Sequence, residues 1–409
     1  MAVGFSPRTP GALPDLEGVV AALAADAARH DADGSFPHQA FDLLHQRGVL
    51  DLLVPAELGG GGAGLEVAAR VLMELGRGDP SVALVTALHL LQHAQMAAPG
   101  SVWPPEERRR IQRSVVEGPA LVNALRVEPE LGTPARGGMP ATVARRLPDG
   151  AGFSLHGRKI YSTGAPGLRW LLVYACTDDE RPLVGQLVVD TAAAPNGAGW
   201  RIEPTWNHLG MRATASHDIV FDGVAVPAEA ALDFRPADDP APVDPLLMGW
   251  NALLIAATYH GVALAARDWL VGYLHRRVPS GLGRSLATLP RFQEAVGGIE
   301  ARVRTSTRLL IDTARRVDGS GDPHDGHPER VEALADAAMV KWTVTNAAIA
   351  SVSEAVALVG NPGLSRNNDL ERHLRNVLCS RIHTPQDDTI LAGAGRSALA
   401  AYQPEAAGQ

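Results

Sequence analysis

The chain has 409 residues, of which 46% are hydrophobic and 20% charged, so it is long enough for two or three domains and too apolar for a disordered protein. Its formal net charge of −8 and the lack of a long basic run exclude a typical nucleic-acid-binding surface. Two cysteines, Cys176 and Cys379, are too few for a disulfide framework and favour a reducing compartment. We see no signal peptide and no membrane-spanning run, and expect a cytoplasmic protein with no membrane partner.

The first part of the chain carries apolar side chains at helical spacing. The clearest amphipathic segments run from Leu65 to Leu75 and from Ser81 to Met96. Asp79-Pro80 before Ser81 is typical of a helix start, because proline fits the first helical turn. We therefore predict an N-terminal helical domain over residues 1–118.

A glycine run within this domain, Gly59 to Gly64 (GGGGAG), matches the G-x-G-x-x-G pattern of dinucleotide-binding folds. Asp79 also lies near the position expected for a ribose-binding acid. However, Pro55 and Glu57 stand just before the run, so no strand leads directly into it. We interpret the run as a turn between helices, with a nucleotide site as the alternative.

Residues 119–233 change to short segments of alternating hydrophobicity, separated by glycine, proline and aspartate. This pattern predicts a middle domain of antiparallel β-structure. The segments are Phe153 to His156, Trp170 to Ala175, Gln186 to Val189 and Ile219 to Phe221.

The helical period returns in residues 234–409, which we predict to be a C-terminal helical domain. An order of helices, strands and helices indicates three segregated blocks and excludes a doubly wound sheet. The predicted helices run from Leu246 to Leu274, Phe292 to Val317, Val331 to Val359 and Leu370 to Val377.

Three stretches in the same order resemble the acyl-CoA dehydrogenase superfamily. They are Gly48 to Gly64 with Arg77 to Ser81, Trp206 to Pro227 (WNHLGMRATASHDIVFDGVAVP), and Arg276 to Gln293. The resemblance implies a mixed, mainly α fold with an N-terminal helical domain, a middle antiparallel β-barrel-like domain and a C-terminal four-helix bundle. It also implies a homodimer or homotetramer, and a flavin between the middle domain and the bundle.

The resemblance further implies which residues bind the flavin. Arg277, or Arg276 in the alternative register, suits a phosphate, and Gln293 suits an adenine or ribose edge, so FAD is favoured, with FMN as the alternative. Val127 stands where the family has a threonine, and Thr133 stands in for a serine of the same loop.

The segment Lys159 to Ala165 (KIYSTGA) matches the family's segment at the flavin face. It adds Tyr161, Ser162 and Thr163 to the predicted flavin-binding residues. From the residues alone, Tyr161 is equally a half-buried strand residue.

The carboxylate that an acyl-CoA dehydrogenase needs as a base is missing from this sequence. The family places a glutamate at one of two positions, which correspond by register to Thr384 and to the neighbourhood of Asn251. No Asp or Glu occurs from Pro245 to Arg267, and Asp387 and Asp388 lie further along the chain.

A flavin monooxygenase branch that resembles dibenzothiophene monooxygenase fits better, because it shares Tyr161 to Gly164 and the Arg375 to Val377 run with His383. We predict His383 as a proton donor or as a partner of the activated oxygen, and Ser162 as a hydrogen-bond donor near the flavin. His89 is a third candidate, with a satisfied core histidine as its alternative.

We therefore predict a flavin-dependent oxidoreductase, leaning to a reduced-flavin monooxygenase that acts on a small organic substrate. The alternatives are an FAD-dependent acyl-CoA dehydrogenase and a catalytically silent flavin-binding or scaffold protein. A monooxygenase of this kind would receive reduced flavin from a separate flavin reductase, because no credible nicotinamide site is present. The histidines form no convincing metal set.

Overall fold

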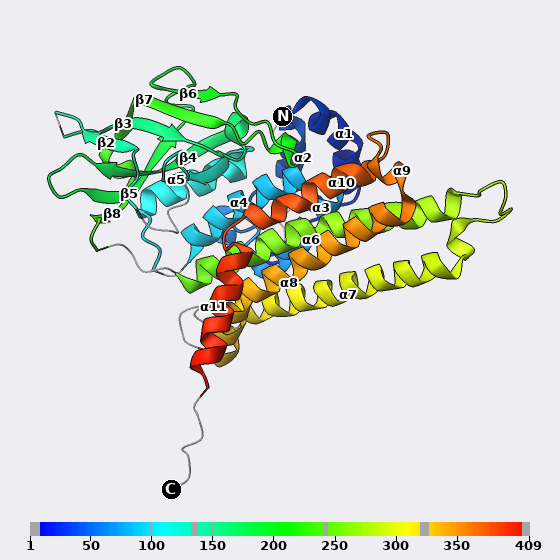
Figure 1. Ribbon diagram of the computed structural model, residues 1–409. Coiled ribbons are helices and arrows are strands. Elements are labelled where there is room, and N and C mark those ends of the chain that lie inside the picture. Colours follow the sequence, from blue (N-terminus) through cyan, green and yellow to red (C-terminus); the bar gives the residue numbers. More distant parts are fainter. Residues whose placement is uncertain are drawn as a thin grey trace, which may run out of the picture.

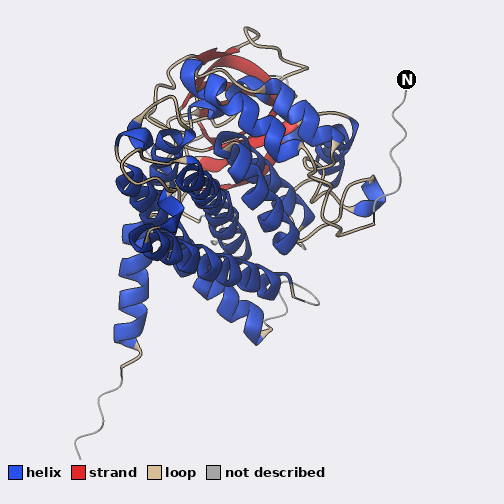
Figure 2. Cartoon of the chain, turned by 90° about the vertical axis from the view of Figure 1, so that its right-hand side faces the viewer, coloured by secondary structure: helices blue, strands red, loops and turns tan. Residues whose placement is uncertain are grey.

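The computed structural model describes residues 9–98, 100–131, 138–148, 150–239, 244–319 and 327–402. Within these ranges the chain forms a helical part, a β-sheet and a second helical part, in that order (Figure 1). Figure 2 shows the helices enclosing one side of the sheet. The predicted order of helices, strands and helices is therefore confirmed.

Helix α4 is the most buried helix of the N-terminal part. Asp79 accepts a hydrogen bond from the backbone N–H of Ser81 at 2.8 Å, and Pro80 occupies the first turn, so α4 begins where the sequence predicts. Because α4 packs against α3, the sheet and the C-terminal helix α6, its side chains are buried on most faces. The helices are α1 (Val19–Asp33), α2 (His38–Gln46), α3 (Leu65–Gly78), α4 (Pro80–Ala97) and α5 (Pro105–Glu117).

The glycine run is a turn that leads into α3, as interpreted from the sequence. The carboxylate of Asp318, from the end of α7, accepts hydrogen bonds from the backbone N–H groups of Leu65 (2.6 Å) and Glu66 (2.8 Å). A side chain at Gly64 would overlap this carboxylate. The helix N-terminus that a nucleotide phosphate would need is thus filled by the chain's own acidic group.

The middle domain is an eight-stranded open sheet in the described residues, with the strand order β6-β7-β3-β2-β4-β5-β8 and with β1 paired to β4. The expected middle β-domain is confirmed and most of its strand pairs are antiparallel, but the sheet does not close into a barrel, and β1 and β2 both run parallel to β4. Alternating hydrophobicity reports which face of a strand is buried, but not the direction of its neighbour. The strands are β1 (Leu121–Leu125), β2 (Val143–Arg146), β3 (Gly152–Lys159), β4 (Leu168–Thr177), β5 (Leu183–Asp190), β6 (Trp200–Glu203), β7 (Asp218–Pro227) and β8 (Ala231–Pro236).

The C-terminal part is built around the long helix α6, which packs against α7, α8 and α10. By length and composition α6 could cross a membrane, but 72% of its most apolar window is buried inside the protein, which is typical of a core helix. Figures 1 and 2 both show α11 running away from the bundle. The helices are α6 (Pro245–Arg276), α7 (Pro290–Asp318), α8 (Pro328–Val359), α9 (Asn361–Leu364), α10 (Asp369–Leu378) and α11 (Asp387–Ala400).

Two glycines allow α3 and α6 to touch backbone to backbone. A side chain at Gly261 of α6 would overlap the carbonyl oxygen of Met73 and would lie 2.7 Å from the Cα of Gly76. Similarly, a side chain at Gly76 of α3 would overlap the carbonyl oxygen of Thr258. This close crossing fixes the N-terminal helices on the bundle and so fixes α4 beside α6.

We expect Gly261→Ala to lower the free energy of unfolding by about 2–3 kcal/mol, because neither helix can move away without losing packing elsewhere. Urea denaturation followed by circular dichroism measures this loss. Gly297→Ala on α7 is the matched control, since a side chain there meets nothing within 4 Å. The control should gain about 1 kcal/mol from helix propensity, and equal effects of the two substitutions would contradict the prediction.

Candidate functional site

The segment after β3 turns one side chain outward and the next inward. Tyr161 has a left-handed backbone (φ 55°) and a side chain that is 54% exposed, whereas Ser162 is 1% exposed. The backbone N–H of Ile160 donates to the carbonyl of Val127 at 3.0 Å, and that of Ser162 donates to the carbonyl of His217 at 3.1 Å. These bonds hold the predicted flavin-facing segment between two neighbouring loops.

A group of three aromatic rings, of which Tyr161 is exposed and Trp206 and His208 are half-buried, lies beside this segment. Trp206 and His208 stack with ring centroids 3.7 Å apart, and Tyr161 meets both edge-on at 6.2 Å and 6.0 Å. The indole N–H of Trp206 donates to the carbonyl of Met211 at 3.2 Å, which fixes the ring. We did not assign a role to Trp206 from the sequence, although it opens the stretch that carries the family resemblance.

The hydroxyl of Thr163 is used inside the protein. It is 3.0 Å from the hydroxyl of Ser216, which is 2.7 Å from the hydroxyl of Thr214, and Thr214 donates to the carbonyl of Met211 at 2.8 Å. The carbonyl of Thr163 accepts from the amide of Asn123 at 3.0 Å. Thr163 therefore shapes the segment, and of its two buried hydroxyls only that of Ser162 is left to offer to a ligand.

The hydroxyl of Ser162 is buried and has no hydrogen-bond partner among the described residues. An unpaired buried hydroxyl costs free energy, so its retention points to a partner that the protein itself does not supply. This is the pattern expected of a residue that donates to a bound ligand.

We expect Ser162→Ala to leave the free energy of unfolding unchanged or to raise it by up to about 1 kcal/mol, because no protein hydrogen bond is lost. Ser216→Ala is the matched control, since its hydroxyl is equally buried but contacts two others. The control should lose about 1–2 kcal/mol in urea denaturation. If both variants lose the same amount, Ser162 has a structural partner after all.

His383 lies in the turn between α10 and α11, where its Nε2 is 2.7 Å from the hydroxyl of Tyr259 on α6. Burial, followed by the positive charge of Lys341, lowers the pKa of His383 to about 3. The imidazole is therefore neutral at physiological pH. The predicted role as an imidazolium proton donor is not supported, and a neutral ring that offers or accepts a hydrogen bond takes its place.

The two positions at which the family carries its glutamate meet in space. The side-chain amide of Asn251 donates to the backbone carbonyl of Thr384 at 2.7 Å, so neither position brings a carboxylate. Asp387 instead accepts from the amide of Asn346 on α8 at 3.0 Å, and Asp388 is exposed. The two acidic residues that follow Thr384 most closely in the sequence therefore do not lie at this contact, since one bonds to α8 and the other is exposed to solvent.

The Trp206–Met211 loop packs on the helix that leads to His383. The backbone N–H of Met211 donates to the side-chain oxygen of Asn376 on α10 at 2.7 Å. Arg375 of the predicted Arg375–Val377 run donates to the carbonyl of Leu209 at 2.9 Å and forms an ion pair with Asp31 at 2.7 Å. The loop that carries the aromatic group and the segment that carries His383 are therefore joined through α10.

His89 does not belong to this arrangement. It is 1% exposed, and its two ring nitrogens contact the carbonyl of Leu50 (2.8 Å) and the backbone N–H of Val122 (3.2 Å). The ring connects α4 to the sheet. His89 is therefore a core histidine whose hydrogen bonds are satisfied, which was the alternative to its predicted catalytic role. His93, one turn further along, is the unexpected residue, because neither of its buried ring nitrogens has a partner among the described residues.

The residues predicted to bind the phosphate and adenine of FAD lie apart from the segment predicted to contact the flavin ring. Arg277 ends α6, about 27 Å along the helix from Tyr259, at the end of the bundle away from the sheet (Figure 1). Gln293 is exposed, and its amide donates to the carbonyl of Ala287 at 3.0 Å. Thr133 lies outside the described residues. The carbonyl of Val127 is engaged by the protein, as described above.

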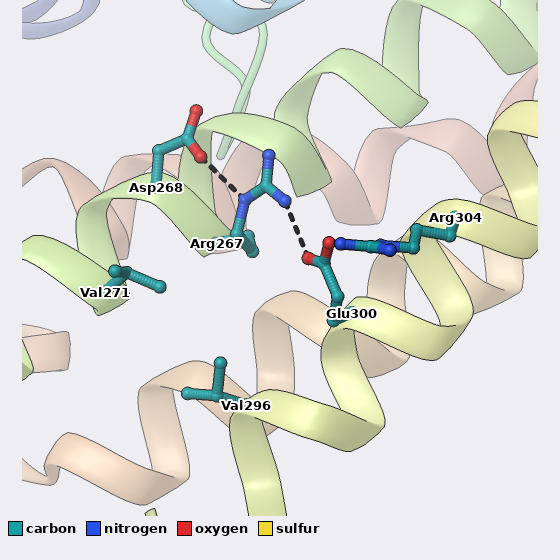
Figure 3. A pocket seen from close by; sticks show the side chains of 6 residues that line it. All are labelled: Arg267, Asp268, Val271, Val296, Glu300 and Arg304. Atoms are coloured by element: carbon teal, nitrogen blue, oxygen red, sulfur yellow. Dashed lines mark hydrogen bonds and ion pairs between the residues drawn. The ribbon is translucent and has the colours of Figure 1, made fainter. Parts of the chain in front are cut away.

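A surface hollow of about 400 Å³ lies between α6 and α7 (Figure 3). Its charged groups neutralise one another, since Arg267 contacts Asp268 (2.6 Å) and Glu300 (2.7 Å), and Arg304 contacts Glu300 (2.6 Å). A smaller hollow of about 120 Å³ beside it includes Gln293 in its lining. Neither contains a residue of the Ser162 or His383 segments.

Family models of the acyl-CoA dehydrogenase N-terminal, middle and C-terminal domains match residues 17–102, 127–224 and 253–387. The chain belongs to the acyl-CoA dehydrogenase family. It is 31% identical to YdbM of Bacillus subtilis (strain 168), an acyl-CoA dehydrogenase by name, over 89% of this chain and 90% of that protein.

The chain is also similar to a nitrososynthase, to a monooxygenase and to a solved structure that contains FMN. The chain is 31% identical to L-evernosamine nitrososynthase of Micromonospora sp., over 88% of this chain and 83% of that protein. It is 25% identical to dibenzothiophene monooxygenase of Rhodococcus qingshengii, over 93% and 91%. The structure of KijD3 in complex with FMN and a dTDP-linked amino sugar superposes with a TM-score of 0.80 at 27% identity, covering 98% of this chain and 96% of that one.

Proposed function

We propose that the protein is a flavin-dependent monooxygenase that uses reduced flavin and O2 to oxygenate a small organic substrate. The contact between Asn251 and Thr384 carries the proposal. An amide and a backbone carbonyl meet where dehydrogenation needs a carboxylate to remove the proton next to a thioester. Without that base the fold keeps its flavin-binding features and lacks the defining group of the dehydrogenases.

The residues present fit a flavin. Ser162 offers an unpaired buried hydroxyl, and the exposed ring of Tyr161 and the half-buried rings of Trp206 and His208 offer an aromatic surface next to it. The similarity to KijD3, whose structure contains FMN, supports FMN. Arg277 and Gln293 support FAD only if a second copy of the chain brings them to this site, because they lie far from it within one chain. A homodimer or homotetramer would allow this.

When bound, reduced flavin would supply two of the four electrons that O2 takes up, and the substrate would supply the other two as it gains one oxygen atom while the other oxygen atom leaves as water. Ser162 would hold the reacting edge of the ring with its hydroxyl proton. His383, as a neutral imidazole, would present one ring nitrogen to the substrate while Tyr259 occupies Nε2. The aromatic group would cover the site against water.

Reduced flavin would come from a separate flavin reductase. The glycine run, the one sequence feature that resembled a nucleotide site, faces Asp318 and offers no room for a phosphate. The cytoplasm, where such reductases and their nicotinamide donors are found together, is the compartment that we propose.

Acyl-CoA dehydrogenation is the second candidate, favoured by the 31% identity to YdbM. It would require Asp387 to leave Asn346 and reach the site. A catalytically silent scaffold is the third candidate and predicts no turnover of any kind.

The experiment combines two flavin assays on the purified full-length chain. Anaerobic mixing of the oxidised flavoprotein with acyl-CoA thioesters of different chain lengths should leave the flavin absorbance unchanged. Chemically reduced flavin, mixed with protein and O2, should give oxygenated product from a panel that spans amino sugars and aromatic heterocycles. Ser162→Ala should weaken flavin binding and release more hydrogen peroxide, although the variant stays folded.

Bleaching of the flavin by an acyl-CoA would contradict the proposal and establish the dehydrogenase. Failure to bind either oxidised or reduced flavin would establish the scaffold. Hydrogen peroxide as the sole product across the whole panel, at the same rate with and without protein, would also overturn monooxygenation.

A further inference from the structure

The chain of 409 residues contains only two lysines, Lys159 and Lys341, against 35 arginines. Both lysines are fully buried, at 0% exposure, which is rare for this residue type. Lys159 is the last residue of the strand that leads into Tyr161 and Ser162. Lys341 lies on α8, below the turn that carries His383. Each lysine thus lies directly behind one of the two segments of the candidate site.

Lys341 binds the His383 turn through its backbone. Its ammonium group donates to the carbonyl of His383 at 2.8 Å and to the carbonyl of Pro385 at 2.6 Å. The carbonyl between them, that of Thr384, accepts from Asn251 of α6 at 2.7 Å. Three consecutive carbonyls of the turn are therefore held by side chains of two different helices.

We propose that Lys341 is the positioning residue for His383, fixing the turn so that the imidazole meets Tyr259 and offers its other nitrogen to the substrate. This inference rests on the proposed role of His383. An ammonium group is suited to the task because it has three donors and can hold two carbonyls at once, which a neutral amide on α8 does less well. Asn251 assists by holding the middle carbonyl.

The charges around the turn agree with this role. Lys341 faces Asp387 of α11, which is the carboxylate that partly offsets its charge, and faces His383 and through it Tyr259 of α6. Burial lowers the pKa of Lys341 to about 8, so it is still mainly protonated at neutral pH. A cation behind His383 also disfavours a second proton on the imidazole, which keeps the ring in its neutral form.

The test uses nitrogen-15 NMR of histidine-labelled full-length protein at pH 7.5, without flavin, and His383→Gln identifies the His383 signals. In the wild type the two ring nitrogens of His383 should show the shifts of a single fixed tautomer. In Lys341→Met they should move toward the averaged values of a ring that exchanges between tautomers. Thr345→Val is the matched control, because Thr345 is buried one turn further along α8 and bonds only to its own helix.

Averaged tautomer shifts in the wild type would overturn the inference, and this result does not depend on the folding of any Lys341 variant. Unchanged shifts in a folded Lys341→Met, or the same change in Thr345→Val, would overturn it too. Lys341→Gln provides a milder variant that retains two N–H donors without the charge, and it should show an intermediate change.

The oxygenation assay separates this inference from the proposed function. Lys341→Met should lower product formation about 10–100-fold while flavin reoxidation stays within about a factor of two of the wild type. If the NMR result holds but wild-type protein forms no oxygenated product, the proposed function fails and the positioning of His383 stands. If product forms but neither the shifts nor the yield respond to Lys341, the inference fails alone.

Discussion

Acidification from pH 6.5 to about pH 5 is expected to unfold the protein, because four buried histidines and the half-buried His383 are held in the neutral form. Burial lowers the pKa of His89, His260 and His373 to about 4 and that of His383 to about 3, and it lowers the pKa of His93 well below its usual range. In the unfolded chain each of these rings binds a proton near pH 6.5.

The direction of the effect follows from proton binding. Between pH 6.5 and the lowered pKa values, the unfolded state binds more protons than the folded state, so stability falls as the pH falls. Each histidine lowers the free energy of unfolding by about 1.4 kcal/mol per pH unit, so the five together lower it by about 7 kcal/mol per pH unit. This loss is comparable to the whole stability of a typical domain. Burial raises the pKa values of Asp79 and Asp318, which oppose the trend, but these are only two groups.

Urea denaturation at half-unit steps from pH 7.5 to pH 5 measures this slope. His93→Phe is the informative variant, because the ring of His93 has no polar partner to lose among the described residues. This variant should lose about 1.4 kcal/mol less of its free energy of unfolding per pH unit than the wild type does, and it should unfold at a lower pH. Constant stability down to pH 5 would mean that these rings take up protons in the folded protein.

Lys159→Met is expected to lower the free energy of unfolding at pH 7 by about 3–5 kcal/mol, because it leaves Glu128 charged and buried. The ammonium group of Lys159 is 2.5 Å from the carboxylate of Glu128, and the two side chains are 0% and 2% exposed. Thr142 and the backbone of Ala141 also donate to this carboxylate, each at 2.6 Å.

The pKa values of the pair are consistent with two charges at neutral pH. Burial alone would raise the pKa of Glu128, but the hydrogen bonds from Lys159 and Thr142 lower it below its usual value. Burial lowers the pKa of Lys159 to about 8 despite the nearby carboxylate. Both groups are thus charged near pH 7. Removing only one of them leaves the other as an unpaired buried charge, which lowers the stability of the protein.

A double-mutant cycle with Glu128→Gln tests this explanation. Lys159→Met combined with Glu128→Gln should recover part of the loss, because the glutamine carries no charge and its single amide oxygen still accepts from Thr142, although its NH2 group loses the bond from Ala141. If the double variant is less stable than Lys159→Met, the packing of the lysine stem and not its charge accounts for the effect.

Several features were predictable from the sequence because a local pattern fixes them. Asp79 and Pro80 mark the start of α4, and the uncharged run from Leu246 onward identifies a core helix. The missing base was also predictable, because its two positions are set by register. The contact between Asn251 and Thr384 confirms that both positions belong to one place.

Other features depend on contacts between distant segments, which no local pattern encodes. Nothing in the strands β1 and β2 reveals that they run parallel to β4. In the sequence, Tyr259 cannot be distinguished from the apolar residues around it. In the structure its hydroxyl forms a hydrogen bond with His383, which lies 124 positions further along the chain. His89 and His93 look alike on their helix, and only the tertiary structure shows that backbone groups occupy the first ring.

The burial of both lysines has a practical consequence for studying this protein. Reagents that modify side-chain amines have no target on the folded surface and react only when a lysine is transiently exposed. The rate of amine labelling at Lys159 would therefore report opening of the sheet behind Tyr161, and the rate at Lys341 would report opening of the bundle behind His383. Peptide mass analysis of a labelling time course would follow the two events separately in one sample.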